Sequence, residues 1–361
     1  MATHELYVDE DTQLGEYLDT LTSAAPLALD TEFVREKTYF PKLCLIQIAA
    51  GGSIACIDCI ADMDYRKLFD HLLCAEHTWI VHSGRQDLEV IHQHTQRVPA
   101  RLIDTQIAAG LIGYPPQVGL QEVLADALGV HLAKEFTRTD WSRRPLPEAA
   151  LEYARDDVRS LHALWDALAA KLDALGRLDW LAQDCAWTLR QPLVTPTEQI
   201  WGRLKGLRAL DAASQGAALA LVAWREARAQ SRDRPRRWIL SDEQLIALAR
   251  SKPASLSELH AVPDFPPRLA QQCGQDLLAA LADADAPAMR AAVTRALAPE
   301  PPEKARLRAL QAAAKAKAEA LGIQPELLAT KQELVDLLTD RRPARIFETW
   351  RAAELTELLD V

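Results

Sequence analysis

The apolar residues in the first half of the chain form short runs in some places and helical stripes in others. Short apolar runs predict strands at 27–33, 43–50, 53–57, 79–82 and 102–104. Apolar residues at helical spacing predict helices that start near Asp11 and cover 64–75, 85–94 and 105–111. Asp104 is expected to cap the last of these helices, and a carboxylate that supports a metal site from outside its ligands is the weaker alternative. Strands come first and then alternate with helices, which predicts a mixed sheet: an antiparallel meander joined to parallel strands that helices cover.

One longer apolar stripe predicts a single helix over 148–173, the longest of this half. Beyond Arg190 the pattern changes, because alanine and leucine dominate and no strand-like run of note follows. Capping-box spacings mark helix starts at Ser241, Ser255 and Thr330. The chain therefore divides into an α/β domain at 1–195, a helical bundle at 196–283, a linker at 284–302 with one further helix at 286–297, and a second helical bundle at 303–361.

The charge of the chain is distributed unevenly. The formal net charge is −10, but residues 1–190 hold 29 acidic and 17 basic side chains, while residues 191–361 hold 22 acidic and 24 basic ones. The overall charge argues against a nucleic-acid partner, and its uneven distribution weakens that argument. The second half also contains a local cluster of arginines: Arg225, Arg228, Arg232, Arg234, Arg236 and Arg237.

The composition is that of a globular protein with two or three domains: 361 residues, of which 49% are hydrophobic. No apolar run approaches the ~20 residues of a membrane span, and the first residues lack the features of a secretory signal. The six cysteines lie mostly among apolar residues, which predicts reduced thiols in a cytoplasmic protein. A zinc or redox role for Cys56 and Cys59 is the weaker interpretation, because no second pair follows at zinc-site spacing.

Two carboxylates interrupt the strand predicted at 27–33. Asp30 and Glu32 are two positions apart, so in a strand they lie on the same face. Two such close charges repel each other unless a cation lies between them, and a divalent cation held by oxygen ligands is the usual solution. A solvent-facing pair on an edge strand is the alternative, because the pattern D-x-E is common.

Further acidic residues are candidate partners for this pair. Asp87 follows the strand at 79–82, and sites in parallel sheets form at the carboxyl ends of strands. Taken alone, Asp87 is better explained as an acidic residue favoured at the start of a helix. Tyr153 and Asp157 are four positions apart and share one helix face. Asp156 is turned away by about 100° and is expected at the surface, paired with an arginine. Taken alone, Tyr153 is also typical of a half-buried aromatic residue.

Together, these residues resemble the ribonuclease D family of DEDD-type 3′-to-5′ exonucleases. The resemblance rests on segments 29–35, 82–87 and 153–157, which contain the acids and the tyrosine, and it extends to 39–47 and 104–106. It implies a ribonuclease H-like α/β domain with a mixed sheet. It also implies that two all-α bundles of the HRDC type follow, which bind nucleic acid or help to orient it. For the helical half, the resemblance rests on the order and pattern of the predicted helices, so it is less specific.

The resemblance implies hydrolysis of RNA from the 3′ end by two divalent cations, Mg²⁺ or Mn²⁺, with release of 5′-mononucleotides. Asp30 would bridge the two ions, Asp157 and Glu32 would hold the first with it, and Asp87 would hold the second, through water. Glu32 would also help to recognise the terminal 3′-hydroxyl. Tyr153 would orient the attacking water, because a phenol with a pKa of about 10 is a poor base near neutrality. Carboxylate oxygens suit these ions, whereas zinc favours cysteine and histidine.

The same resemblance implies RNA as the partner, with tRNA precursors and other small structured RNAs as substrates and with neither an obligatory protein partner nor a membrane. Residues 134–144, including Arg138 and Arg143, mix cations with aromatics, which suits either a single strand entering the site or a solvated loop. The arginine cluster at 225–237 is either an RNA contact or a charged helix end. DNA as the substrate and a non-catalytic binding protein are the alternative functions, and the intact set of acids argues against the second.

Overall fold

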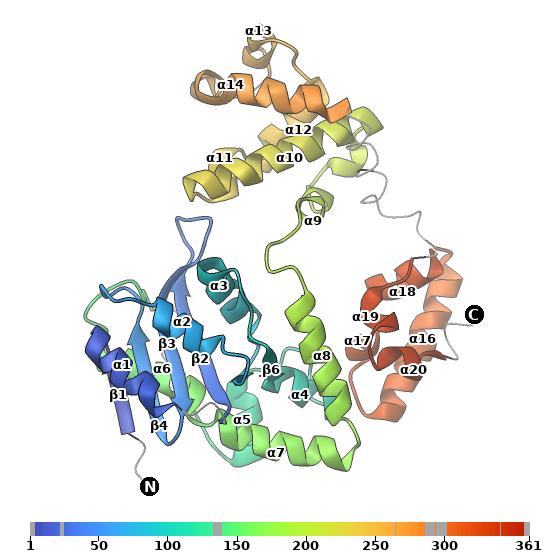
Figure 1. Ribbon diagram of the computed structural model, residues 1–361. Coiled ribbons are helices and arrows are strands. Elements are labelled where there is room, and N and C mark those ends of the chain that lie inside the picture. The colour runs from blue at the N-terminus through green and yellow to red at the C-terminus, as the bar shows by residue number, and fades with distance from the viewer. Residues whose placement is uncertain are drawn as a thin grey trace. The chain divides into compact units, whose positions relative to one another are not determined.

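The computed structural model describes residues 4–21, 25–132, 139–263, 265–285, 293, 302–339 and 341–356. The chain forms two compact units (Figure 1). Unit 1 comprises Met1–Val34, Lys42–Leu193 and Glu300–Val361, and unit 2 comprises Arg35–Pro41 and Val194–Pro299.

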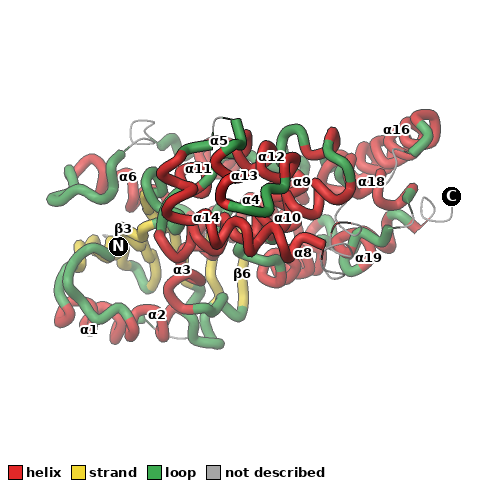
Figure 2. The backbone as a smooth tube through the Cα atoms, turned by 90° about the horizontal axis from the view of Figure 1, so that it is seen from above, coloured by secondary structure: helices red, strands yellow, loops and turns green. Residues whose placement is uncertain are grey.

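Unit 1 is built on a mixed sheet with the strand order β1-β4-β3-β2-β5-β6, drawn in yellow in Figure 2. The described strands are β1 His4–Val8, β2 Leu27–Val34, β3 Lys42–Ala50, β4 Ser53–Asp58, β5 Thr78–Val81 and β6 Arg101–Asp104. β2, β3 and β4 form an antiparallel meander, and β5 and β6 extend it in parallel from β2. The predicted mixed sheet is therefore confirmed.

The sequence did not reveal β1, which pairs in parallel with β4 at the edge of the sheet. Its residues are mostly exposed or half-buried, and only Val8 is fully buried. A short edge strand of this kind lacks the continuous apolar run by which the other strands were predicted. The chain order is therefore strand, helix and then the meander.

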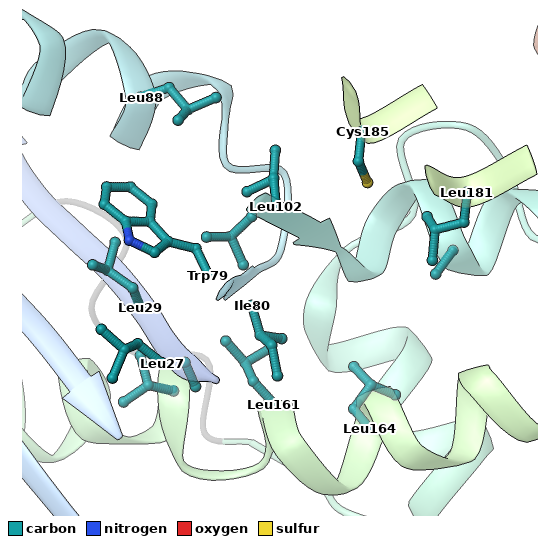
Figure 3. Packing of buried hydrophobic residues seen from close by; sticks show 14 of the residues in the cluster. Leu27, Leu29, Trp79, Ile80, Leu88, Leu102, Leu161, Leu164, Leu181 and Cys185 are labelled. Carbon is teal, nitrogen blue, oxygen red and sulfur yellow. The ribbon is translucent and has the colours of Figure 1, made fainter. Parts of the chain in front are cut away.

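The helices of unit 1 pack along the sheet and close its core. In the part of unit 1 before residue 194 they are α1 Asp11–Thr20, α2 Arg66–Leu72, α3 Arg85–Thr95, α4 Thr105–Leu111, α5 Leu120–Leu128, α6 Glu148–Arg159, α7 Leu161–Ala174 and α8 Leu178–Arg190. α6 contacts β2, β3 and β4, while α7 contacts β5 and α8 contacts β6. Figure 3 shows Leu29 of β2 beside Trp79 of β5 and Leu161 of α7 beside Ile80 of β5, all in one hydrophobic cluster.

The single helix predicted over 148–173 is wrong, because the chain breaks it at Ser160. There φ is −105° and ψ is 1°, so the backbone leaves the helical region for one residue between α6 and α7. Val158 before the break and Leu161 after it are both buried. The apolar stripe therefore continues across the break, and its periodicity alone does not reveal the change of helix.

A C-terminal bundle completes unit 1. Its helices are α16 Lys304–Leu321, α17 Pro325–Leu328, α18 Lys331–Leu338, α19 Ala344–Phe347 and α20 Arg351–Glu354. The ring of Trp350 stacks on Trp180 of α8 with centroids 4.0 Å apart. Beside this stack, Arg351 and Asp184 form a buried ion pair, with Arg351 Nη2 donating to Asp184 Oδ2 at 2.9 Å. The bundle therefore shares its core with the sheet domain.

Unit 2 is helical and has its own hydrophobic core. Its described helices are α9 Thr197–Gly202, η1 Leu207–Ala209, α10 Ala212–Arg232, α11 Arg236–Ile239, α12 Asp242–Ser251, α13 Leu256–His260, α14 Pro267–Ala282 and η2 Asp283–Asp285. The helix starts predicted at Ser241, Ser255 and Thr330 are confirmed, since each side chain accepts an N–H of its own first turn. The helix expected at 286–297 lies, apart from residue 293, outside the described residues.

Two sequence expectations concern the whole chain. The cysteines are all free thiols, and four of the six are buried. In the described residues, every helix is either too short or too polar to cross a bilayer.

Candidate active site

Asp30 and Glu32 of β2 meet Asp157 of α6. One carboxylate oxygen from each of these residues lies within 4.8 Å of the other two. The alternation of side chains along β2 places its two acids on one face, and α6 packs against that strand. The three acids line a pocket of about 300 Å³ together with Tyr153 and His82.

Asp87 lies outside this group of three. It occupies the first turn of α3 and is 6% exposed. Its Oδ1 accepts a hydrogen bond from Thr31 Oγ1 at 2.5 Å, so the residue between the two acids of β2 fixes its carboxylate. Asp87 is still close enough for its charge to raise the pKa of Asp30, Glu32 and Asp157.

Burial and mutual repulsion make the charged forms of these acids unfavourable. Burial, followed by the charges of the other three acids, holds the pKa of Asp30 well above its usual range. Burial, followed by Asp157 and Asp87, raises the pKa of Glu32 to about 8. Burial also raises the pKa of Asp157 to about 7 and that of Asp87 to about 6. At neutral pH the site therefore needs bound protons or a cation.

The residues of this pocket suit a divalent cation. The described residues that line it include no lysine or arginine, so no side-chain cation neutralises the acids. Gln47 lies directly across the sheet from Asp30 and is fully buried, and its amide has no hydrogen-bond partner among the described residues. Clustered carboxylate oxygens and an unpaired amide are groups that a hydrated Mg²⁺ or Mn²⁺ would satisfy.

A tight turn before α3 positions Asp87. Ser83 has a φ of 63°, and a Cβ on Gly84 would lie 2.4 Å from Val81 Cγ2, so only glycine fits there. The Asp104 carboxylate accepts the backbone N–H groups of Ser83 and Gly84 at 2.9 and 3.0 Å. It also accepts the N–H of Gln106 at 2.9 Å, which confirms the predicted cap of α4. The sequence gave no indication that the same carboxylate holds the turn.

His82 lines the pocket, although the sequence analysis assigned it no role. Its Nε2 donates to the carbonyl of Val118 at 3.0 Å, and its Nδ1 lies 2.9 Å from Thr105 Oγ1. Burial lowers the pKa of this histidine. Both bonds fix the ring at the rim of the pocket. In the sequence, His82 ends a predicted strand and begins the segment 82–87 on which the family resemblance rests, but neither observation gave it a role.

Ion pairs hold α6 in place. Arg155, which is buried, and Arg159 both form ion pairs with Glu5 of β1 and with Glu152. Arg159 also pairs with Asp156 at 2.9 Å, which confirms the pairing predicted for that acid. The edge strand that sequence analysis missed therefore anchors the helix that carries Tyr153 and Asp157.

In the aromatic and basic segment at 134–144, the described side chains are less accessible than the composition of the segment indicates. Arg138 lies outside the described residues, and Arg143 is exposed, with its side chain paired to Asp140. Trp141 is buried, so it offers no stacking surface. Arg144 donates to the buried Asp58 and is half-buried itself.

The arginine cluster at 225–237 divides into buried and exposed members. Arg225 is 1% exposed and donates to Asp242 Oδ1 at 2.7 Å, so the prediction that it contacts RNA is wrong. Arg228 and Arg236 are half-buried and form ion pairs within the bundle. The exposed members are Arg232, Arg234 and Arg237.

Known proteins share both halves of this architecture. A 3′-5′ exonuclease family model matches residues 6–173, and the HRDC domain model matches residues 214–281. Ribonuclease D of Xanthomonas oryzae pv. oryzae is 36% identical over 352 residues, covering 95% of each chain. Ribonuclease D of Pseudomonas paraeruginosa is 32% identical over 98% of this chain and 96% of its own length.

A solved structure agrees with these relatives. The crystal structure of Escherichia coli RNase D, an exoribonuclease involved in structured RNA processing, is similar with a TM-score of 0.83 and 29% identity. The similarity covers 98% of this chain and 97% of that one. The catalytic core of RRP6 from Trypanosoma brucei, at 21% identity and a TM-score of 0.58, shares the fold. The chain belongs to the ribonuclease D family and is a hydrolytic 3′-to-5′ exoribonuclease.

Proposed function

We propose that Asp30, Glu32 and Asp157 hold two divalent cations, Mg²⁺ or Mn²⁺, and that Asp87 supports the second through water. The observation that carries this proposal is the meeting of three half-buried carboxylates within 4.8 Å without a neutralising side chain in their pocket. Each of the other three acids raises the pKa of Asp30, which supports a bridging position for it. When bound, two such ions would activate water and stabilise the leaving oxygen of the phosphodiester.

Tyr153 positions the attacking water rather than removing its proton. Its hydroxyl donates a hydrogen bond to the Asp157 carboxylate. Burial and the charge of Asp157 raise the pKa of Tyr153 above its usual value, so the phenol stays protonated near neutrality. A protonated phenol can orient a water molecule but cannot act as its base. Glu32, in the same pocket, is the candidate for recognition of the terminal 3′-hydroxyl.

The substrate proposal is RNA with a free 3′ end, with tRNA precursors as the first candidates and 5′-mononucleotides as the products. An end-labelled tRNA precursor and a DNA of matched sequence would be incubated with Mg²⁺, Mn²⁺ or a chelator. We expect stepwise release of mononucleotides from the RNA only when an ion is present. Cleavage that persists in chelator, or that starts inside the chain, would contradict the proposal.

Two substitutions test the assigned roles in the same assay. Asp30→Asn should abolish metal-dependent cleavage, because the proposed bridging ligand loses its charge. Tyr153→Phe should slow turnover without weakening the binding of Mn²⁺, measured by calorimetry. Asp166→Asn makes the same change at an exposed position of α7 and serves as the control. Unchanged turnover in Tyr153→Phe would reject the positioning role.

We also propose that the C-terminal bundle is a second, diverged copy of the HRDC unit, so that the segments 1–195, 196–283, 284–302 and 303–361 describe the chain. A left-handed residue ends α10 at Asp233 and α16 at Gly322. A four-residue helix and then a capping box follow in both bundles, at Ser241 and at Thr330. Each pair of positions is 89 residues apart, which supports a repeat.

RNA contact through the exposed arginines of unit 2 is the last part of the proposal. Arg232, Arg234 and Arg237 are exposed on the first bundle, and exposed cations are the groups that contact phosphates. Arg143 is a further exposed candidate in unit 1, although Asp140 competes for it. The cytoplasmic location expected from the sequence stays a prediction.

A further inference from the structure

The helix α11 carries an exposed tryptophan among exposed cations. Trp238 is 61% exposed, far more than the other tryptophans of the described chain, which are buried or half-buried. The Arg234 guanidinium carbon lies 6.0 Å from the centroid of its ring. The Arg237 side chain is 66% exposed, and its contacts to Asp242 and Glu243 are long, at 3.8 and 3.9 Å. An aromatic face with cations beside it is the arrangement that binds single-stranded nucleic acid.

Contacts within unit 2 hold the turn that presents these residues. Asp233, at a φ of 45°, accepts the backbone N–H groups of Tyr39 and Phe40, both at 3.0 Å. Arg236 pairs with Glu226 at 2.9 Å and lies over the ring of Tyr39. These contacts use the side chains that point inward and leave Arg234, Arg237 and Trp238 outside. The aromatic residue is therefore exposed on a fixed turn and not on a loose loop.

The equivalent turn of the C-terminal bundle serves a different purpose. Leu327 of α17 stands 89 residues after Trp238, in line with the repeat. It packs on Gly110 of α4, where an added Cβ would lie 3.0 Å from Leu327 Cδ1. The position of Arg234 is taken by Ile323, which is buried. In the C-terminal bundle these two positions are thus apolar, with Ile323 buried and Leu327 half-buried in unit 1, whereas in unit 2 they are cationic or aromatic and exposed.

We propose that α11 and the preceding turn form a stacking platform for an unpaired base of the RNA substrate. The base lies on the face of Trp238, and Arg234 and Arg237 contact the adjacent phosphates. The proposal rests on the assignment of RNA as the substrate and specifies single-stranded RNA at this site. A duplex cannot use the platform, because its bases are already stacked on each other.

The test measures binding of a fluorescein-labelled oligoadenylate to the full chain by anisotropy, in chelator so that the RNA is not cleaved. Trp238→Ala should weaken binding roughly tenfold or more, since stacking on an aromatic residue contributes that much per base. It should not change the slope of log affinity against log salt, because stacking releases no counterion. Arg234→Gln should instead reduce that slope by about 0.7, the value for one lost phosphate contact on a single strand.

Matched variants separate stacking from other effects. Trp238→Phe keeps an aromatic face and should retain most of the affinity, and Arg268→Ala, at an exposed position of α14 in the same unit, should bind like the wild type. A duplex RNA of the same length should bind Trp238→Ala and the wild type equally. Equal affinity of Trp238→Ala and the wild type for oligoadenylate would overturn the platform, as would an equal loss for duplex and single strand. Because no metal is present, the result is independent of cleavage by the carboxylate site, which Asp30→Asn tests separately.

Discussion

Replacing Glu32 with glutamine measures how much the repulsion and burial of the site's carboxylates lower the free energy of unfolding in the absence of metal. Burial, Asp157 and Asp87 raise the pKa of Glu32 from 4.5 to about 8. Below pH 4.5 Glu32 is protonated in both the folded and the unfolded chain, so its ionisation does not change the free energy of unfolding. As the pH rises toward the higher value, the unfolded chain releases its proton first, so the free energy of unfolding falls. At about pH 7.5 the pH lies about 3 units above the pKa of Glu32 in the unfolded chain. The free energy of unfolding is then lower by about 4 kcal/mol than it is below that pKa.

Glutamine cannot ionise, so the Glu32→Gln variant does not lose stability in this way. Its buried amide lacks a partner, which costs about 2 kcal/mol at every pH. At about pH 7.5 the variant should therefore be more stable than the wild type by about 2 kcal/mol, or about 4 °C in melting temperature for a unit of this size. Near pH 4.5 it should be less stable by a similar amount, so the sign of the difference reverses with pH.

The assay follows thermal unfolding of the full chain by circular dichroism in chelator across this pH range. Glu16→Gln removes an exposed glutamate of α1 and should follow the wild type throughout. Saturating Mg²⁺ should stabilise the wild type more than Glu32→Gln, because the variant lacks a proposed ligand. A difference in melting temperature between Glu32→Gln and the wild type that stays constant with pH would refute the reasoning.

Three further outcomes follow from the structure. Asp184→Ala leaves the buried guanidinium of Arg351 unpaired and should lower the free energy of unfolding by about 3–5 kcal/mol, and adding Arg351→Met should recover much of the lost melting temperature. Gly84→Ala forces a Cβ against Val81 and should reduce exonuclease turnover by about 100-fold through displacement of the next helix, whereas Gly119→Ala, with open space around it, should have no effect. Chelation of the wild type should stop hydrolysis and lower its melting temperature near neutral pH, and added Mg²⁺ should restore both.

Local periodicity accounts for the part of the site that could be predicted. Alternation along β2 places Asp30 and Glu32 on one face, and the four-residue spacing on α6 places Tyr153 beside Asp157. Neither pattern depends on the rest of the fold, so both can be read from a few neighbouring residues. The packing of α6 on β2 brings together residues more than one hundred positions apart, and only the family resemblance indicated it.

The features that the sequence did not reveal depend on contacts between residues that are far apart in the chain. The six arginines at 225–237 look alike in sequence, yet Arg225 is buried, where it pairs with Asp242 on another helix. Asp104 was recognised as a cap from its neighbours, but its two bonds to the turn at 83–84 join residues about twenty positions away. The break at Ser160 was hidden because α6 and α7 bury one continuous stripe on the same sheet.

The acids of the site are held together, against their repulsion, by contacts with neighbouring residues of the fold. Thr31 fixes Asp87, Asp104 fixes the turn before it, and the ion pair of Arg159 with Glu5 ties α6 to the edge strand β1. None of these contacts involves a metal ion, so the carboxylates are in position before an ion binds. Binding then replaces protons on groups with raised pKa values rather than ordering the chain. The affinity for Mg²⁺ should therefore rise with pH through the neutral range, while the fold around the site stays the same.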